Sequence, residues 1–160
     1  MSTAPPALAL APIALPVLAG TGLYAAWSDL RHRRLPNWLA GLVAAAALAA
    51  TAWQSGLAPA VSAALHGAAA FLIGLALYAR GAFGGGDIKY YAAVAAWFPL
   101  GLAPRLLGWV SLSGLVLALG WLAWQRLAGS KSDRSAPTDH DKLPFGIAIA
   151  AGALLAAVSA

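Results

Sequence analysis

The sequence predicts an all-α, polytopic membrane protein with six transmembrane helices and with its N-terminus and C-terminus outside. Three observations support this prediction: 61% of the 160 residues are apolar, only 9% are charged, and the apolar residues form long runs. Soluble domains carry about 25% charged residues, and a spanning helix uses about 20 residues. The length therefore accommodates six spans with short loops and no separate soluble domain.

The apolar runs are separated by Pro, Gly and charged residues, and they lack the alternating pattern of a membrane β-barrel. Backbone groups in lipid must pair internally, so we interpret the runs as helices. A break near Pro99 and Pro104 separates the fourth run from the fifth. Residues 1–160 are predicted to form a single membrane-embedded domain, with a mobile cytoplasmic loop over 129–141. The predicted spans are residues 8–27, 37–53, 58–79, 88–103, 105–127 and 143–159.

Basic residues set the predicted orientation. With the N-terminus outside, nine Lys and Arg residues lie on the cytoplasmic side and Arg105 alone lies outside, as the positive-inside bias requires. The first run lacks the basic start of a signal peptide, so it is interpreted as a retained span. We therefore attribute the net charge of +5 to orientation in the membrane and not to a nucleic-acid partner. Interfacial anchors are expected near span ends at Trp27, Trp38, Trp53, Trp109 and Trp124.

The composition also excludes several kinds of site. Cysteine is absent, which excludes a disulfide framework, a thiol nucleophile and a Cys-type zinc site. His and Asp residues show no convincing ligand spacing, and Glu does not occur. Neither a metal nor another cofactor is therefore expected.

Two of the five aspartates stand beside apolar spans. Asp29 closes the first span and Asp87 opens the fourth, so the predicted topology brings both to the cytoplasmic boundary. Ionisable groups at membrane depth mark functional sites, and converging carboxylates tend to share a proton. One can then activate water as a base while the other acts as an acid, as in an aspartic protease. The other three, in the 129–141 loop, are interpreted as solvated charges that attract a basic peptide: Asp133, Asp139 and Asp141.

Each of the two aspartates also has a structural interpretation. Asp87 is a candidate N-cap of the fourth helix. Asp29 ends a helix, where the dipole disfavours a negative charge, and pairing with Arg31 or Arg33 would offset that cost. The glycine run over residues 84–86 suits close approach of an extended peptide, or is simply a flexible turn.

Three segments carry a resemblance to a known family. The first runs from Asp29 through basic residues to Leu35, Pro36 and Asn37, and the second is Gly84, Gly85, Gly86 and Asp87, followed by Ile88 and Lys89. The third is a Pro-x-Gly element at Pro144 and Gly146. In this order they resemble the motifs of the type IV prepilin peptidases, which are Gly-x-Gly-Asp intramembrane aspartic proteases. Leu35 in place of the commoner Ile, and the third glycine, are mild departures from the family's pattern.

The resemblance implies a short, peptidase-only member of the Tad/Flp kind, with Asp29 and Asp87 as the catalytic pair. Such a protein removes the basic leader from prepilins or pseudopilins at the cytoplasmic face of the bacterial inner membrane. The chain lacks the cysteine motifs and the length of bifunctional members, so no N-methyltransferase activity is expected. The resemblance gives a supporting, site-shaping role to Gly84, Gly85, Gly86, Lys89, Pro36, Asn37, Pro144 and Gly146.

Three other functions stay open at this point. A small transporter could use Asp29 and Asp87 as a proton or cation relay, although both are predicted at one membrane face whereas a relay needs polar groups through the membrane. A serine intramembrane protease could use His66 with Ser111 or Ser113, although no glycine elbow brackets either serine. A scaffold would tolerate asparagine at either aspartate.

Overall fold

The protein is helical throughout the part that its computed structural model describes, which is residues 11–32, 35–127 and 145–159. No strand occurs within those ranges, so the all-α fold class is confirmed. The predicted loop over 129–141 and Pro144 lie outside the described residues. The elements are α2 (Ala11–His32), α3 (Asn37–Ser55), α4 (Leu57–Ala79), α5 (Gly85–Ala95), η1 (Leu100–Leu102), α6 (Ala103–Leu127) and α7 (Phe145–Val158).

Helix α3 shows how the local sequence defines an element. Pro36 precedes it in an extended conformation, which suits a residue that cannot donate a backbone hydrogen bond. Gly56 ends it with a φ of 89°, a conformation that L side chains rarely adopt, and so allows the turn into α4. Its buried residues recur every fourth position along one face, at Leu39, Val43, Ala47 and Thr51.

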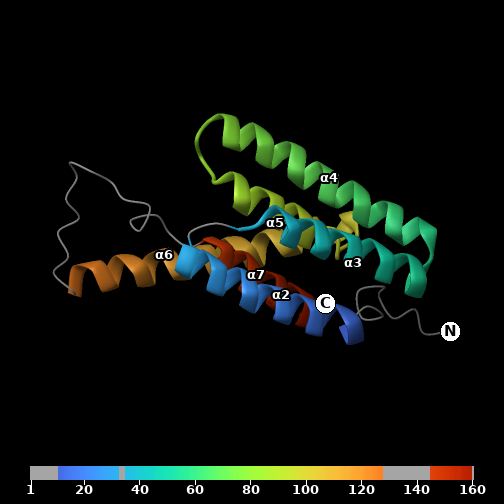
Figure 1. Cartoon of the computed structure of the whole chain (residues 1–160), viewed down its shortest axis with the longest axis horizontal. Helices are drawn as coiled ribbons and strands as arrows, with labels where there is room; N and C mark the ends of the chain where they lie inside the picture. Colours follow the sequence, from blue (N-terminus) through green and yellow to red (C-terminus); the bar gives the residue numbers. More distant parts are fainter. Residues whose placement is uncertain (1–10, 33–34, 128–144, 160) are drawn as a thin grey trace.

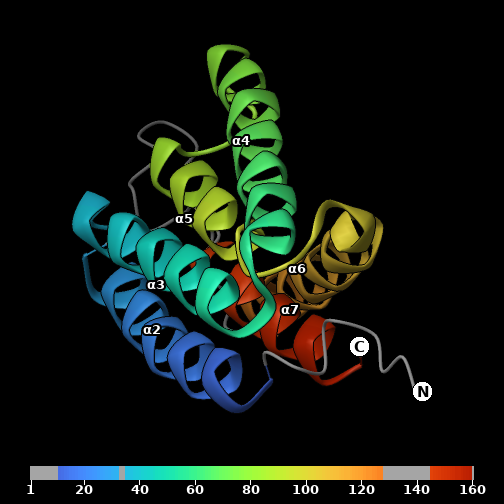
Figure 2. The same cartoon turned by 90° about the vertical axis from the view of Figure 1, so that its right-hand side faces the viewer.

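The helices pack as two groups of three. Helices α2 and α6 both pack on α7, whereas α3, α4 and α5 pack on one another. Contacts of α5 with α7 and of α2 with α3 join the groups (Figure 2). Successive helices run in alternating directions, so the C-terminal end of α2 and the N-terminal ends of α3, α5 and α7 meet at one end of the bundle (Figure 1). We call this the site end.

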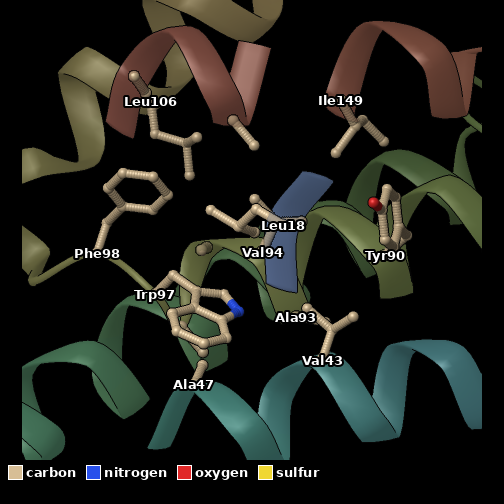
Figure 3. Close-up of a cluster of buried hydrophobic side chains, with 14 of the residues drawn as sticks. Leu18, Val43, Ala47, Tyr90, Ala93, Val94, Trp97, Phe98, Leu106 and Ile149 are labelled. Atoms are coloured by element: carbon tan, nitrogen blue, oxygen red, sulfur yellow. The ribbon is translucent and has the colours of Figure 1, made fainter. Parts of the chain in front are cut away.

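Helix α5 lies at the centre of the core. Tyr90 and residues 92–98 are all buried. Figure 3 shows side chains of this segment between Val43 of α3 on one side and Ile149 of α7 and Leu106 of α6 on the other. The C-terminal part of α5, from Ala92 to Ala95, is apolar on all its sides, and such a segment is stable only when other elements surround it.

The fourth predicted helix differs from α5 in its bounds. It was predicted over 88–103, but α5 begins at Gly85 and ends at Ala95. Tight hydrogen bonds from the N–H groups of Trp97 and Phe98 to carbonyls three residues earlier close the helix, and Pro99 then prevents its continuation. An 11-residue helix is roughly 16 Å long, about half the thickness of the hydrocarbon core. Helix α5 alone is therefore too short to cross a bilayer.

The turn after α5 is hydrogen-bonded to α4. The N–H of Leu100 donates to Oγ of Ser62 at 3.1 Å, and Nδ1 of His66 donates to the carbonyl oxygen of Phe98 at 2.9 Å. Ser62 and His66 are four residues apart and so share one face of α4. His66 thus serves as a buried polar partner of this turn.

Three described stretches are long and apolar enough to cross a membrane: Asn37–Ser55, Leu57–Ala79 and Leu100–Leu127. Helix α7 is a shorter apolar helix. Most residues of the three long stretches are not buried inside the protein, which fits apolar side chains that face lipid. The helices are therefore consistent with a membrane protein, while six spans and the orientation of the termini stay predictions.

Small residues allow close approach of neighbouring helices, as is common in membrane bundles. A Cβ placed on Gly22 of α2 would lie 3.0 Å from Cβ of Ala150 in α7. At Gly152 of α7 a Cβ would lie 2.5 Å from Cα and 2.7 Å from the backbone nitrogen of Val110 in α6. Backbone atoms cannot move aside as a flexible side chain can, so α6 and α7 need a glycine at position 152.

We expect Gly152→Ala to destabilise the protein because α6 and α7 would have to separate, at a cost of roughly 1–3 kcal/mol. The matched control is Gly120→Ala in α6, where nothing lies within 4 Å of the added Cβ. That variant should keep or gain up to about 1 kcal/mol through its better helix propensity. Thermal unfolding of the two variants in one detergent measures the difference. Equal melting temperatures would contradict the packing of α6 against α7.

Candidate active site

Asp29 lies near the C-terminal end of α2 and is only 7% exposed. The backbone N–H of Gly146, in the first turn of α7, donates to its Oδ2 at 2.9 Å. N–H groups in a first helical turn have no partner within the helix, and the dipole there favours a negative charge. The end of α2 is an unfavourable place for a carboxylate, and the start of α7 compensates for it.

Asp87 lies in the first turn of α5, but it is not the N-cap that the sequence suggested. Gly84 is the N-cap, in an extended conformation with φ −72° and ψ 141°. The carboxylate folds back over this glycine, since a Cβ at Gly84 would lie 2.9 Å from Oδ2 of Asp87. A larger residue at position 84 would therefore displace the carboxylate.

The two aspartates influence each other although they are far apart in the sequence. Burial raises the pKa of Asp87 from its ordinary 3.8 to about 6, and the negative charge of Asp29 contributes further to the rise. Asp87 precedes the predicted fourth span, at the site end of the bundle. The fold thus places the Asp29 carboxyl beside the N-terminal end of α7 and the Asp87 carboxyl at the N-terminal end of α5.

Leu35 lies between the segments that carry the two carboxyls. A Cβ on Gly86, next to Asp87, would lie 3.3 Å from Cβ of Leu35. A Cβ on Gly146, which hydrogen-bonds Asp29, would lie 3.3 Å from Cδ1 of the same leucine. Leu35 therefore contacts both glycines.

Three further contacts join residues from different segments at the site end. Nζ of Lys89 donates to Oδ1 of Asn37 at 3.0 Å, which joins α5 to the start of α3. The rings of Phe83 and Phe145 meet edge to face with centroids 5.4 Å apart. A Cβ on Gly85 would lie 3.5 Å from the ring of Tyr78.

Most of the residues that the sequence singled out are thus brought together at the site end. Pro36, as N-cap of α3, and Asn37, as its first residue, hold the segment that contains Leu35. Of the three consecutive glycines, Gly84 is exposed whereas Gly85 and Gly86 are partly covered. Pro144 falls outside the described residues.

Sequence analysis gave no site role to Leu35, Phe83 or Phe145. They carry no group that can exchange a proton or bind a metal, so a search for chemically active residues passes over them. The signals available in the sequence are that Leu35 belongs to the Leu-Pro-Asn segment and that Phe83 and Phe145 stand beside motif residues. Within the described ranges, no three His, Asp or Glu residues gather into a possible metal site.

Comparison with known families tests the interpretation of this geometry. Residues 16–119 match the model of the type IV leader peptidase family. The chain belongs to this family. The matched range is more than half of the leader peptidase and includes Asp29, Leu35 and Asp87, whereas Gly146 lies beyond it. No curated protein and no solved structure matches significantly. The protein is therefore a protease of the leader peptidase type, and the family implies prepilin substrates in general.

The raised pKa of Asp87 predicts how stability depends on pH. A carboxyl with a higher pKa in the folded protein binds more protons when folded, so the free energy of unfolding falls as pH rises between 3.8 and about 6. The loss from this group amounts to at most roughly 3 kcal/mol. Asp87→Asn should flatten this part of the curve. Unfolding at several pH values between 3.5 and 7 compares the two proteins, and parallel curves would contradict the environment described for Asp87.

Proposed function

We propose that this leader peptidase is an intramembrane aspartic endopeptidase that uses Asp29 and Asp87 as its catalytic pair. Its substrates would be type IV prepilins or pseudopilins of the Flp/Tad kind, from which it removes the basic leader without N-methylation. The observation that carries the proposal is that two carboxyls from distant segments meet at one end of the bundle, where Gly146 donates to Asp29 and Leu35 lies beside both Gly146 and the Gly86 that precedes Asp87. The negative charge of Asp29 accordingly contributes to the raised pKa of Asp87. An aspartic protease needs such a pair to hold one proton between them.

The surroundings of the two carboxyls suggest different roles for them. A backbone N–H donor favours an ionised carboxylate, so we assign the base to Asp29, which accepts from Gly146. The higher pKa of Asp87 gives it a larger protonated fraction near neutral pH than an ordinary aspartate has, so we assign it the acid.

In the proposed reaction Asp29 takes a proton from a water molecule, and the water oxygen attacks the scissile carbonyl carbon. Asp87 donates its proton to the carbonyl oxygen as negative charge develops there. When the tetrahedral intermediate collapses, the C–N bond breaks and the leaving nitrogen receives the proton held by Asp29. Asp87 recovers its proton from the hydroxyl group as the new carboxyl forms, and the site returns to its starting state.

The start of α5 suggests where the peptide lies. Gly84 is exposed and extended, immediately before the turn that contains Asp87. Gly85 and Gly86 pack against Tyr78 and Leu35 and so are less open to a substrate. An extended peptide could pass beside Gly84 and bring its carbonyl to the two carboxyls, because no side chain projects from that residue.

We further propose six spans, of which the fourth consists of α5 together with the turn that follows it, with both termini outside and the site at the cytoplasmic face of the inner membrane. Exposed tryptophans at both ends of the bundle support a bundle that crosses a bilayer with the site end at one of its surfaces. Trp27 and Trp38, at the site end, are 50% and 57% exposed, and Trp53, at the opposite end of α3, is 90% exposed. Indole rings favour the headgroup level at both membrane surfaces.

Substitution of either aspartate tests the mechanism. Asp29→Asn and Asp87→Asn keep the side-chain shape but remove one of the two roles, so each should lower leader removal by at least roughly a thousandfold. The control is Ser111→Ala, at an exposed position of α6 outside the proposed catalytic pair, which should retain cleavage. Purified proteins are incubated with a candidate prepilin, and loss of the leader is followed by mass. Full cleavage by either site variant would contradict the catalytic role of that aspartate and would favour a relay or a scaffold.

The absence of cysteine allows a clean test of orientation. Ser55→Cys is expected at the outer surface and Ser132→Cys in the cytoplasmic loop. A membrane-impermeant maleimide added to right-side-out vesicles should label the first variant, and should label the second only after the vesicles are opened. The reverse pattern would invert the proposed topology.

A further inference from the structure

The two proposed catalytic residues come from different helix groups. Asp29 belongs to α2, which packs on α7 and α3, and Asp87 belongs to α5, which packs on α3, α4 and α7. Helices α2 and α5 are not among the helix pairs with substantial contact. Helices α3 and α7 contact both of them, so the separation of the two carboxyls depends on how these helices and the residues between them pack.

Leu35 lies between the first turns of α5 and α7, next to a glycine in each. Its Cβ and backbone face Gly86, where an added Cβ would lie 3.3 Å from Cβ, 3.6 Å from the nitrogen and 3.7 Å from the oxygen of Leu35. Its Cδ1 faces Gly146, at 3.3 Å from an added Cβ. Neither glycine has a side chain to fill the space, so this leucine fills it on both sides.

We propose that Leu35 is a positioning residue that fixes the separation of the Asp29 and Asp87 carboxyls, as a spacer between the first turns of α5 and α7. The inference rests on the proposed function, in which these two carboxyls react together. Leu35 itself touches neither the water nor the peptide in this scheme.

The segment around Leu35 is held in a way that suits a spacer. Pro36 follows it and restricts the backbone of the preceding residue to extended conformations. Asn37 then accepts the hydrogen bond from Lys89 of α5, which keeps the start of α3 against that helix. The leucine side chain also packs against the buried core cluster. Its backbone and its side-chain end are thus both fixed.

Each glycine on the two sides is directly linked to one carboxyl. Gly86 precedes Asp87 in the chain, and Gly146 donates its N–H to Asp29. Any change in the width of the spacer would therefore move the two carboxyls relative to each other. Misplacement of reacting groups by about 1 Å can cost about a hundredfold in rate.

A size series at position 35 tests the inference. Leu35→Ala removes the carbons that face Gly146, and we expect kcat for leader removal to fall about tenfold to a hundredfold with KM within about twofold. Leu35→Ile keeps the number of carbons and should restore kcat to within about threefold of the unchanged protein. Both constants are measured on the full chain in detergent with one prepilin.

The matched control is Leu48→Ala. Leu48 is also a partly buried leucine of the core cluster, but it lies on α3 away from both carboxyls. It should lower the melting temperature as Leu35→Ala does, while kcat stays within about twofold of the unchanged protein. If Leu35→Ala does not fold, Leu35→Val shortens the side chain by one carbon and is expected to lower kcat by about threefold to tenfold.

The outcomes separate this inference from the function on which it rests. An unchanged kcat in the folded Leu35→Ala or Leu35→Val variant would overturn the spacer role and leave the protease intact. An equal fall of kcat in Leu48→Ala would also overturn it, since general loosening of the core would then explain the effect. If the unchanged protein fails to remove the leader, the proposed function fails, before Leu35 is tested at all.

Discussion

The hydrogen bond from Gly146 to Asp29 is the constraint on which the site end depends. A carboxylate that is only 7% exposed at the C-terminal end of a helix is opposed both by burial and by the dipole of that helix. The first turn of α7 supplies a backbone donor at 2.9 Å and a dipole of the favourable sign. This contact joins the beginning of α7 to the end of α2, within the group formed by α2, α6 and α7.

Asp87, the second carboxyl, is positioned at the site end by a different helix, α5. Helix α5 is half the length of a span and is enclosed by its neighbours, so its first turn lies at the site end while its last turn is buried in the core. Gly67 and Gly74 of α4 allow it to pack closely, because an added Cβ at either position would collide with Ala92 or Ile88. The short central helix therefore places Asp87 in a partly buried position at its first turn.

The two positions give the carboxyls unequal environments. Asp29 accepts a backbone hydrogen bond, whereas burial and the neighbouring charge raise the pKa of Asp87. Such inequality separates the acid from the base in enzymes that use two carboxyls. The proposed division of roles follows from helix geometry: one carboxylate meets the start of another helix, and the other lies in the first turn of its own.

The sequence by itself determined the helical class, from its apolar runs, and it directed attention to two aspartates, because charge beside such runs is rare and costly. It also predicted the start of α3 at Asn37, since proline acts locally on the backbone, whereas α5 begins at Gly85, three residues before its predicted start. It did not reveal that α5 stops at Ala95, because enclosure by other helices makes a half-length apolar helix possible. The tertiary structure alone decided that Gly146 partners Asp29 and that Leu35 lies between two glycines, because such contacts join distant segments and involve residues without reactive groups.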